Sequence, residues 1–245
     1  MSGSGPGLGF LCVSLAAAAN LLGGAVVTLR RFDEHVLRYV IALGAGFMLA
    51  AAVLRMIPES ARLTAHATTL VLAGYLLIHL FEHTVAPHFH FGAEVHPEQL
   101  EGRTGASALL GLIVHSLFDG ISIGSGFTID RALGLLLFAA IILHKAPEGF
   151  TIASVVLATR GTRRQALLAA SAVGVATLIG GFAIMGTQRL VGPALAASAG
   201  VTLYVAASDL VPEVNREGGT PVAVTVFLGV VLYYATDRVL AAIGV

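Results

Sequence analysis

Residues 114–126, VHSLFDGISIGSG, and residues 143–154, LHKAPEGFTIAS, decide the fold of this chain. Each stretch carries a histidine followed four residues later by a carboxylate, His115 with Asp119 and His144 with Glu148. Residues i and i+4 lie on one face of an α-helix about one turn apart, so each stretch places an imidazole beside a carboxylate. Two such faces turned toward each other form a pocket with four ligands.

Both stretches lie within long apolar segments. The flanks are apolar over roughly the 20 residues that a bilayer-spanning helix needs, which places the polar groups near the middle of a membrane. Each ionisable group costs about 2.5 to 3.5 kcal/mol there on insertion scales. With Lys145 included, five such groups occur together, and this indicates a polar path through the bilayer.

The composition identifies the class of protein. Hydrophobic residues make up 56% of the 245 residues and charged residues 11%, and the mean hydropathy is +0.88. Too few polar side chains are present to solvate a globular domain of this length, so we predict an all-α integral membrane protein. The single cysteine, Cys12, excludes an intrachain disulfide and a cysteine-based metal site. The formal net charge of zero argues against a nucleic-acid partner.

Eight apolar segments separated by polar turns predict eight transmembrane helices in a single domain over residues 1–245. They span approximately residues 7–29, 36–57, 65–82, 106–129, 132–158, 165–188, 190–210 and 220–236. The one long loop, residues 83–104, follows the third segment and contains His83, His88, His90 and His96. The turn between the fourth and fifth segments is short, so these segments form an antiparallel hairpin with their histidines at similar depth. The N-terminus lacks a positive region before its first apolar run, so no cleaved signal peptide is expected.

Arginines predict the orientation. The loops after segments one, three, five and seven hold eight arginines, and the other side holds five. The positive-inside rule then makes the odd-numbered loops, including residues 83–104, cytoplasmic and places both termini outside. The short loop with Arg160, Arg163 and Arg164 contributes most, because the rule applies best to short loops.

Segments two and seven share a short internal sequence repeat. Residues 46–59 and residues 200–213 have the same pattern of glycine, leucine and alanine, and both end in Pro-Glu. One segment is even-numbered and the other odd-numbered, so the two copies run in opposite directions. Inverted repeats around a polar site are typical of transporters.

Two imidazoles and two carboxylates offer nitrogen and hard oxygen ligands without a thiolate. This set suits Zn²⁺, and also Fe²⁺, Mn²⁺ or Cd²⁺, better than Cu⁺. A single intramembrane histidine is more often a hydrogen-bonded core residue, but two His-carboxylate pairs on consecutive segments favour a metal path. We therefore predict metal ligation by His115, Asp119, His144 and Glu148.

Two further i,i+4 pairs allow more than one interpretation. Asp209 and Glu213 form either part of the polar path or a solvated helix end. His79 and His83 stand at the edge of the long loop, whose histidines either collect metal or have no such role.

The hexapeptides HSLFDG and HKAPEG resemble the paired signatures of the ZIP (Zrt/Irt-like) metal transporter family. The eight segments, with a histidine-bearing loop after the third, are also similar to that family's layout, so the resemblance covers the whole chain. It implies uptake of a divalent metal, zinc by preference, into the cytoplasm across a plasma or inner membrane. It further implies a homodimer without a cofactor, a 3+2+3 arrangement of helices with inverted repeats, and an elevator-like movement.

Carried over residue by residue, the resemblance places His115, Asp119, His144 and Glu148 at metal-ligand positions on the fourth and fifth helices. Asp209 and Glu213 match a polar cluster on the cytoplasmic half of the seventh helix.

The chain departs from family members that hold two adjacent metals. Those members place an amide or a carboxylate where Ser116 and Lys145 stand, and add a carboxylate on the sixth helix, where this chain has small residues such as Thr177. The ammonium of Lys145 has donors and no acceptor, so it cannot ligate a metal while charged. One hypothesis is that it replaces a second dication; the other is that it snorkels or pairs with a single carboxylate.

Two other functions remain open. An intramembrane metal hydrolase would hold the same metal around an activated water, although the HExxH motif with its general base is absent. A proton-coupled carrier for another solute would use the same side chains as a proton relay. Metal dependence of the flux distinguishes the carrier from a metal transporter, and hydrolysis of a model substrate that fails with His144→Ala would indicate the hydrolase. The sequence favours a transporter over an enzyme.

Overall fold

The computed structural model describes residues 5–29, 34–84, 102–216 and 219–244, and every regular element in these ranges is a helix. The first half contains α1 (Gly5–Leu29), α2 (Glu34–Ala51), the π-helix η1 (Ala52–Met56), α3 (Ile57–Leu63), α4 (Ala67–Thr84) and α5 (Gly102–Ile129). The second half contains α6 (Arg131–Ala158), α7 (Arg163–Met185), the 3-10 turn η3 (Gln188–Leu190), α8 (Val191–Tyr204), the π-helix η4 (Val205–Leu210), α9 (Val211–Arg216) and α10 (Gly219–Ala242). Of the predicted loop histidines, His88, His90 and His96 lie outside the described residues.

Seven helical runs in the described residues are long and apolar enough to cross a membrane. They are Gly7–Thr28, Val36–Leu63, Ala108–Ile129, Arg131–Ala158, Arg163–Met185, Gln188–Arg216 and Gly219–Ala242. The predicted third segment is the helix α4, which is not among the seven; its last two turns carry His79, Glu82 and His83, which reduce its apolar character. The all-helical membrane class is confirmed, and the count of eight spans stays a prediction.

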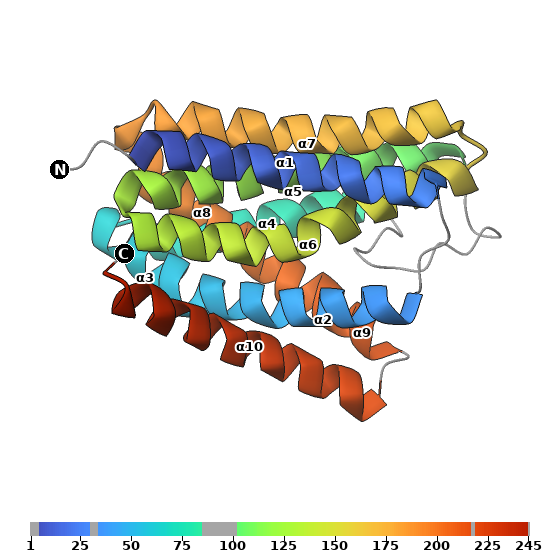
Figure 1. The fold of residues 1–245 in the computed structure, drawn as a ribbon. Helices are drawn as coiled ribbons and strands as arrows, with labels where there is room; N and C mark the ends of the chain where they lie inside the picture. The colour runs from blue at the N-terminus through green and yellow to red at the C-terminus, as the bar shows by residue number, and fades with distance from the viewer. Residues whose placement is uncertain (1–4, 30–33, 85–101, 217–218, 245) are drawn as a thin grey trace.

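The helices form two groups that lie side by side. In one group α1 packs against α6 and α7, and α5 packs against the same two helices. In the other, α2 packs against α10 and α4 packs against α8. Figure 1 shows α7 and α1 along one side of the molecule and α2 with α10 along the opposite side, with α6 between them. The start of α1 and the end of α10 lie at the same end of the bundle.

The hairpin of α5 and α6 has a one-residue turn. Asp130 separates the two helices, and its side chain accepts a 2.9 Å hydrogen bond from the backbone N–H of Leu133, which caps the start of α6. Arg55 of η1 lies 3.8 Å from the same carboxylate. The tight turn confirms the predicted antiparallel hairpin, and it fixes how α5 and α6 face each other.

Pairs of glycines allow four helix crossings at very short range. In each pair, a Cβ on either glycine would collide with a backbone carbonyl three residues before the other glycine. The pairs are Gly23 with Gly149, Gly120 with Gly180, Gly46 with Gly229, and Gly74 with Gly200. Small residues that let backbones touch are the usual device for packing helices in a membrane, where the hydrophobic effect does not drive association.

The internal sequence repeat coincides with an unusual backbone feature. The π-helices η1 and η4 fall in the same part of the two repeated stretches. Each leads directly into a short helix with a proline in its first turn: η1 into α3, and η4 into α9. Arg55 and Asp209 stand at the same sequence distance from Gly46 and Gly200. In Figure 1, α2 and α8 run in opposite directions, as the inverted repeat predicts.

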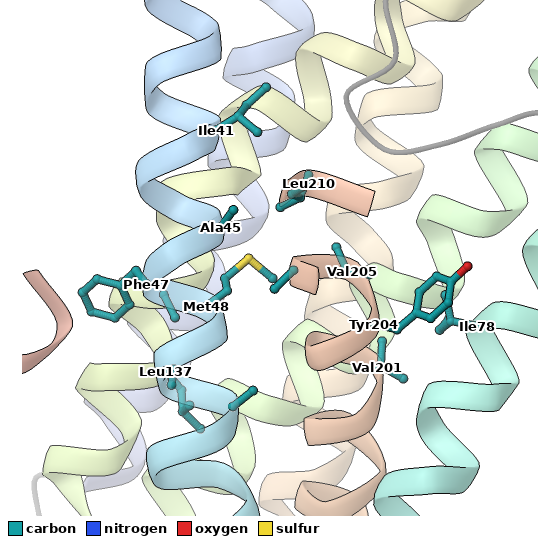
Figure 2. Close-up of a cluster of buried hydrophobic side chains, with 14 of the residues drawn as sticks. Ile41, Ala45, Phe47, Met48, Ile78, Leu137, Val201, Tyr204, Val205 and Leu210 are labelled. Carbon is teal, nitrogen blue, oxygen red and sulfur yellow. The ribbon is translucent and has the colours of Figure 1, made fainter. Parts of the chain in front are cut away.

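The main apolar core lies between the two groups. Figure 2 shows Met48 of α2 pointing toward η4, while Tyr204 and Ile78 meet where α8 packs against α4. Met48 is fully buried, which agrees with a core role.

The glycine crossings predict a sharp sensitivity to volume. Gly200→Ala would force its Cβ into the carbonyl of Val71, a backbone atom that cannot rotate away. Overpacking of this kind costs about 1–3 kcal/mol, so we expect a lower melting temperature for the purified protein in detergent. Gly111→Ala is the matched control, because its nearest neighbour is the Phe81 ring at 3.8 Å. Equal melting temperatures for the two variants would contradict the close approach.

Candidate metal site

The two His-carboxylate pairs meet between α5 and α6. One ligand atom from each of His115, Asp119, His144 and Glu148 lies within 4.8 Å of the other three. All four side chains are buried, with exposed fractions of 3% or less. The i,i+4 spacing therefore acts as the sequence predicts, and the hairpin brings the two faces together.

Asp119 is the central acceptor of the cluster. Its Oδ2 lies 3.0 Å from Nε2 of His115, 3.2 Å from Nε2 of His144 and 2.7 Å from Nζ of Lys145. The two imidazole rings stand 5.6 Å apart, centre to centre. One carboxylate oxygen thus faces both histidines from two different helices.

Lys145 binds both carboxylates and a hydroxyl. Its Nζ lies 2.7 Å from Asp119 Oδ2, 2.6 Å from Glu148 Oε2 and 2.6 Å from Ser116 Oγ, so three donors meet three acceptors. The side chain is fully buried. Lys145 therefore neither snorkels nor pairs with only one carboxylate. A buried charge with every hydrogen bond made is the arrangement that a low-dielectric interior requires.

The remaining contacts orient the ligands. Ser116 donates a 2.5 Å hydrogen bond to Glu148 Oε1. Nδ1 of His144 lies 3.2 Å from the carbonyl oxygen of Ala140. That carbonyl can only accept, so Nδ1 donates in this contact, and Nε2, which faces Asp119, is the nitrogen on the side of the candidate site.

A second buried polar cluster lies between α4 and the π-helix η4. Glu82 lies beside Tyr204 and Asp209, and it lies within electrostatic range of His115 and His83. Beside it, the hydroxyls of Tyr75 and Ser208 are 2.9 Å apart. This cluster therefore stands between the His-carboxylate site and the end of α4.

The structure separates the predicted pair Asp209 and Glu213. Asp209 is buried, whereas Glu213 forms a 3.3 Å ion pair with the exposed Arg216 at the end of α9. The π-helix η4 explains the separation, because its wider turn ends at Leu210 and changes the angular phase between the two positions. Glu213 therefore fits a solvated helix end, whereas the buried Asp209 fits a polar path. At the edge of the predicted loop, His83 stacks on His79 with ring centres 4.2 Å apart.

Two residues near the site are absent from the sequence predictions. Glu82 enters the sequence prediction only as the end of an apolar segment, although a carboxylate there is an ionisable group at membrane depth. Asn20, in the middle of α1, lies against Glu148 and Lys145. The available signal was an isolated polar residue in an apolar helix for Asn20, and a carboxylate beside His79 and His83 for Glu82.

The fold and this buried cluster define a multi-pass membrane protein with a candidate metal site between two spanning helices. The family model described as ZIP Zinc transporter matches residues 94–237. Among curated relatives, the chain is 25% identical to the zinc transporter ZIP9-A of Xenopus laevis, with 85% of this chain and 87% of the relative covered. It is 24% identical, with the same coverage, to the zinc transporter ZIP9 of Micropogonias undulatus. It is also 34% identical over 121 residues to the zinc transporter ZIP9 of Macaca fascicularis, with 44% and 52% covered.

The chain belongs to the ZIP zinc transporter family. The resemblance seen in the two hexapeptides is therefore confirmed. Members of this family are transporters and not enzymes, which sets aside the metal hydrolase.

The ion contacts of Lys145 predict its effect on stability. Lys145→Met would leave two buried carboxylates without their cation, and losing one partner of a buried ion pair costs about 3–5 kcal/mol. We expect a clearly lower melting temperature in metal-free detergent, measured by circular dichroism, and partial recovery in Lys145→Met/Glu148→Gln. The control is Arg62→Met, which breaks the exposed 3.4 Å pair with Glu59. A wild-type melting temperature for Lys145→Met would show that the pairing contributes nothing.

Proposed function

We propose that this protein carries a divalent metal, zinc by preference, across a membrane into the cytoplasm through His115, Asp119, His144 and Glu148 on α5 and α6. The observation that carries the proposal is the convergence of these four buried groups within 4.8 Å in the middle of two spanning helices. Membership of the ZIP zinc transporter family supports metal as the cargo.

The ligand chemistry favours zinc among the candidate metals. Two imidazole nitrogens and two carboxylate oxygens form a four-ligand set of the kind that Zn²⁺ accepts in tetrahedral geometry. Cd²⁺, Fe²⁺ and Mn²⁺ bind the same types of atom, so they are expected as competing cargo. A proton relay for another solute would not need four metal ligands so close together.

Lys145 is proposed as a tethered cation in place of a second metal. Its ammonium touches both carboxylates and Ser116, at the positions where two-metal family members carry other ligands. Because it neutralises Asp119 and Glu148 from one side, a single dication fits beside it. The site would then bind one metal.

The cluster of Glu82, Tyr204 and Asp209 is proposed as the path from the site toward the end of α4. Its support is the proximity of Glu82 to His115 on one side and His83 on the other. Glu213, paired with Arg216, would stand at the far end of this path. The histidines of the predicted loop would then meet the metal after it leaves the helices.

The remaining proposals concern architecture. The matching glycine pairs and π-helices support three helices, two motif helices and three inverted helices. The excess of arginines in the odd-numbered loops supports a cytoplasmic side for these loops and both termini outside. The separation into two packed groups supports an elevator-like movement of one group against the other. A homodimer is proposed from the family resemblance.

Ligand substitutions test the function directly. His115→Ala and Glu148→Ala should each abolish most zinc or cadmium flux into liposomes, because each removes one of four ligands from a site without solvent. The protein should still insert and elute as a single species. His66→Ala is the matched control, since this histidine is exposed and lies in the turn before α4, outside the cluster. Wild-type flux in either ligand variant would remove the site assignment.

Metal stoichiometry tests the tethered cation. Wild-type protein should bind one zinc at this site, and Lys145→Asp should bind two, because the substitution removes a positive charge and adds an oxygen ligand. Elemental analysis of dialysed protein provides the count, with Glu148→Ala as the baseline for other zinc. Two tightly bound metals at the wild-type site would refute the proposal.

A further inference from the structure

Asn20 is the only strongly polar residue between Ser14 and Thr28 of α1. It is fully buried, in the part of α1 that crosses α6. A buried amide among alanines and leucines costs free energy unless its polar atoms find partners. Its partners therefore show why the residue is tolerated at this depth.

The partners of Asn20 belong to the metal site. One of the two terminal amide atoms of Asn20 lies 2.6 Å from the backbone carbonyl oxygen of Lys145 and 3.3 Å from Glu148 Oε2. A carbonyl and an ionised carboxylate can only accept, so the nitrogen, and not the oxygen, is the amide atom that faces them. Asn20 thus donates to Glu148 and to the backbone carbonyl of Lys145.

The carboxylate of Glu148 is held from three helices. Ser116 on α5 donates to Oε1, Lys145 on α6 donates to Oε2, and Asn20 on α1 adds a second donor to Oε2. Three donors restrict rotation of the carboxylate about its last bond. A ligand that is already oriented loses less entropy when it binds a metal.

The helix crossing aims the amide at this carboxylate. A Cβ on Gly149 would collide with the backbone carbonyl of Asn20, and a Cβ on Gly23 would collide with that of Ala146. The backbones of α1 and α6 are therefore in contact next to Glu148. Asn20 has little freedom to turn elsewhere.

The matching crossing of α7 with α5 offers a natural comparison. There Thr177 precedes Gly180 as Asn20 precedes Gly23, and a Cβ on Gly120, next to Asp119, would collide with the carbonyl of Thr177. Thr177 is also fully buried, but its hydroxyl donates to the carbonyl of Val173 in its own helix, at 3.5 Å. The two crossings share their packing, and Asn20 differs from Thr177 in donating to a ligand on another helix.

We propose that Asn20 is a positioning residue that sets metal affinity and metal preference by orienting Glu148 from α1. The inference rests on the proposed function, since it concerns the same site. It makes α1 part of the metal site, although α1 carries no ligand.

The test measures zinc and cadmium flux in liposomes for Asn20→Leu, which keeps the branched shape and removes the donor. Loss of a partner that orients a metal ligand typically weakens metal binding 10–100-fold, so we expect KM for zinc to rise about tenfold or more while the maximal rate changes little. The ratio of zinc to cadmium KM should also change. Asn20→Ser, whose hydroxyl is too short to reach Glu148, should shift KM in the same direction if Asn20→Leu does not fold.

Thr177→Val is the matched control and should keep the wild-type KM. An equal rise in Thr177→Val would assign the effect to crossing geometry and overturn the proposal, as would a wild-type KM in folded Asn20→Leu or Asn20→Ser.

Ser116→Ala combined with Asn20→Leu should raise KM by less than the product of the single changes, because both donors act on one carboxylate. Strict multiplication of the two effects would also contradict it. Wild-type flux that is lost in Glu148→Ala but unaffected in Asn20→Leu would reject only this inference; no zinc flux in the wild type would reject the proposed function.

Discussion

The ammonium of Lys145 between Asp119 and Glu148 is the interaction on which the site depends. Two carboxylates in a low-dielectric interior repel each other, and neither can stay charged there without a cation close by. Lys145 reaches Glu148 at 2.6 Å within α6, and it reaches Asp119 at 2.7 Å because α5 and α6 face each other across a one-residue turn. The charge pairing therefore requires the hairpin geometry, and the hairpin in turn holds its polar face together through that pairing.

The backbone crossings place this charged centre in the interior. α1 and α7 each touch one motif helix at a glycine directly after a carboxylate, Gly149 in one case and Gly120 in the other. Side chains at these two positions would push the outer helices away and let lipid or water reach Asp119 and Glu148. Glycine follows each carboxylate for a packing reason, and the result is a site without exposed ligands.

Much of the site could be predicted from sequence because its information is local. The spacing of His115 to Asp119 and of His144 to Glu148 fixes which side chains share a helix face, and the short turn fixes which faces meet. Glu82 and Asn20 could not be placed in this way, because their partners lie on other helices and depend on how those helices cross. Asp209 and Glu213 were paired by i,i+4 spacing, but a π-helix widens the turn at Asp209, and no residue in η4 marks that change. The third segment was found as a helix, although its histidines and Glu82 keep it outside the seven apolar runs.

If metal passes through the proposed site, the permanent cation of Lys145 beside it has a consequence for release. Nζ of Lys145 and both imidazole Nε2 atoms approach the same oxygen of Asp119, so a dication held by those imidazoles would stand close to the ammonium. At about 4 Å and an effective dielectric constant of about 20, their repulsion is on the order of several kcal/mol, which the two carboxylates must offset. The same four proposed ligands without Lys145 would bind metal more tightly and release it more slowly. In the proposed mechanism, a second transported metal would supply this repulsion only while it is bound, whereas Lys145 would supply it in every cycle, and Asn20 and Ser116 would keep Glu148 oriented for the next ion when the first has left.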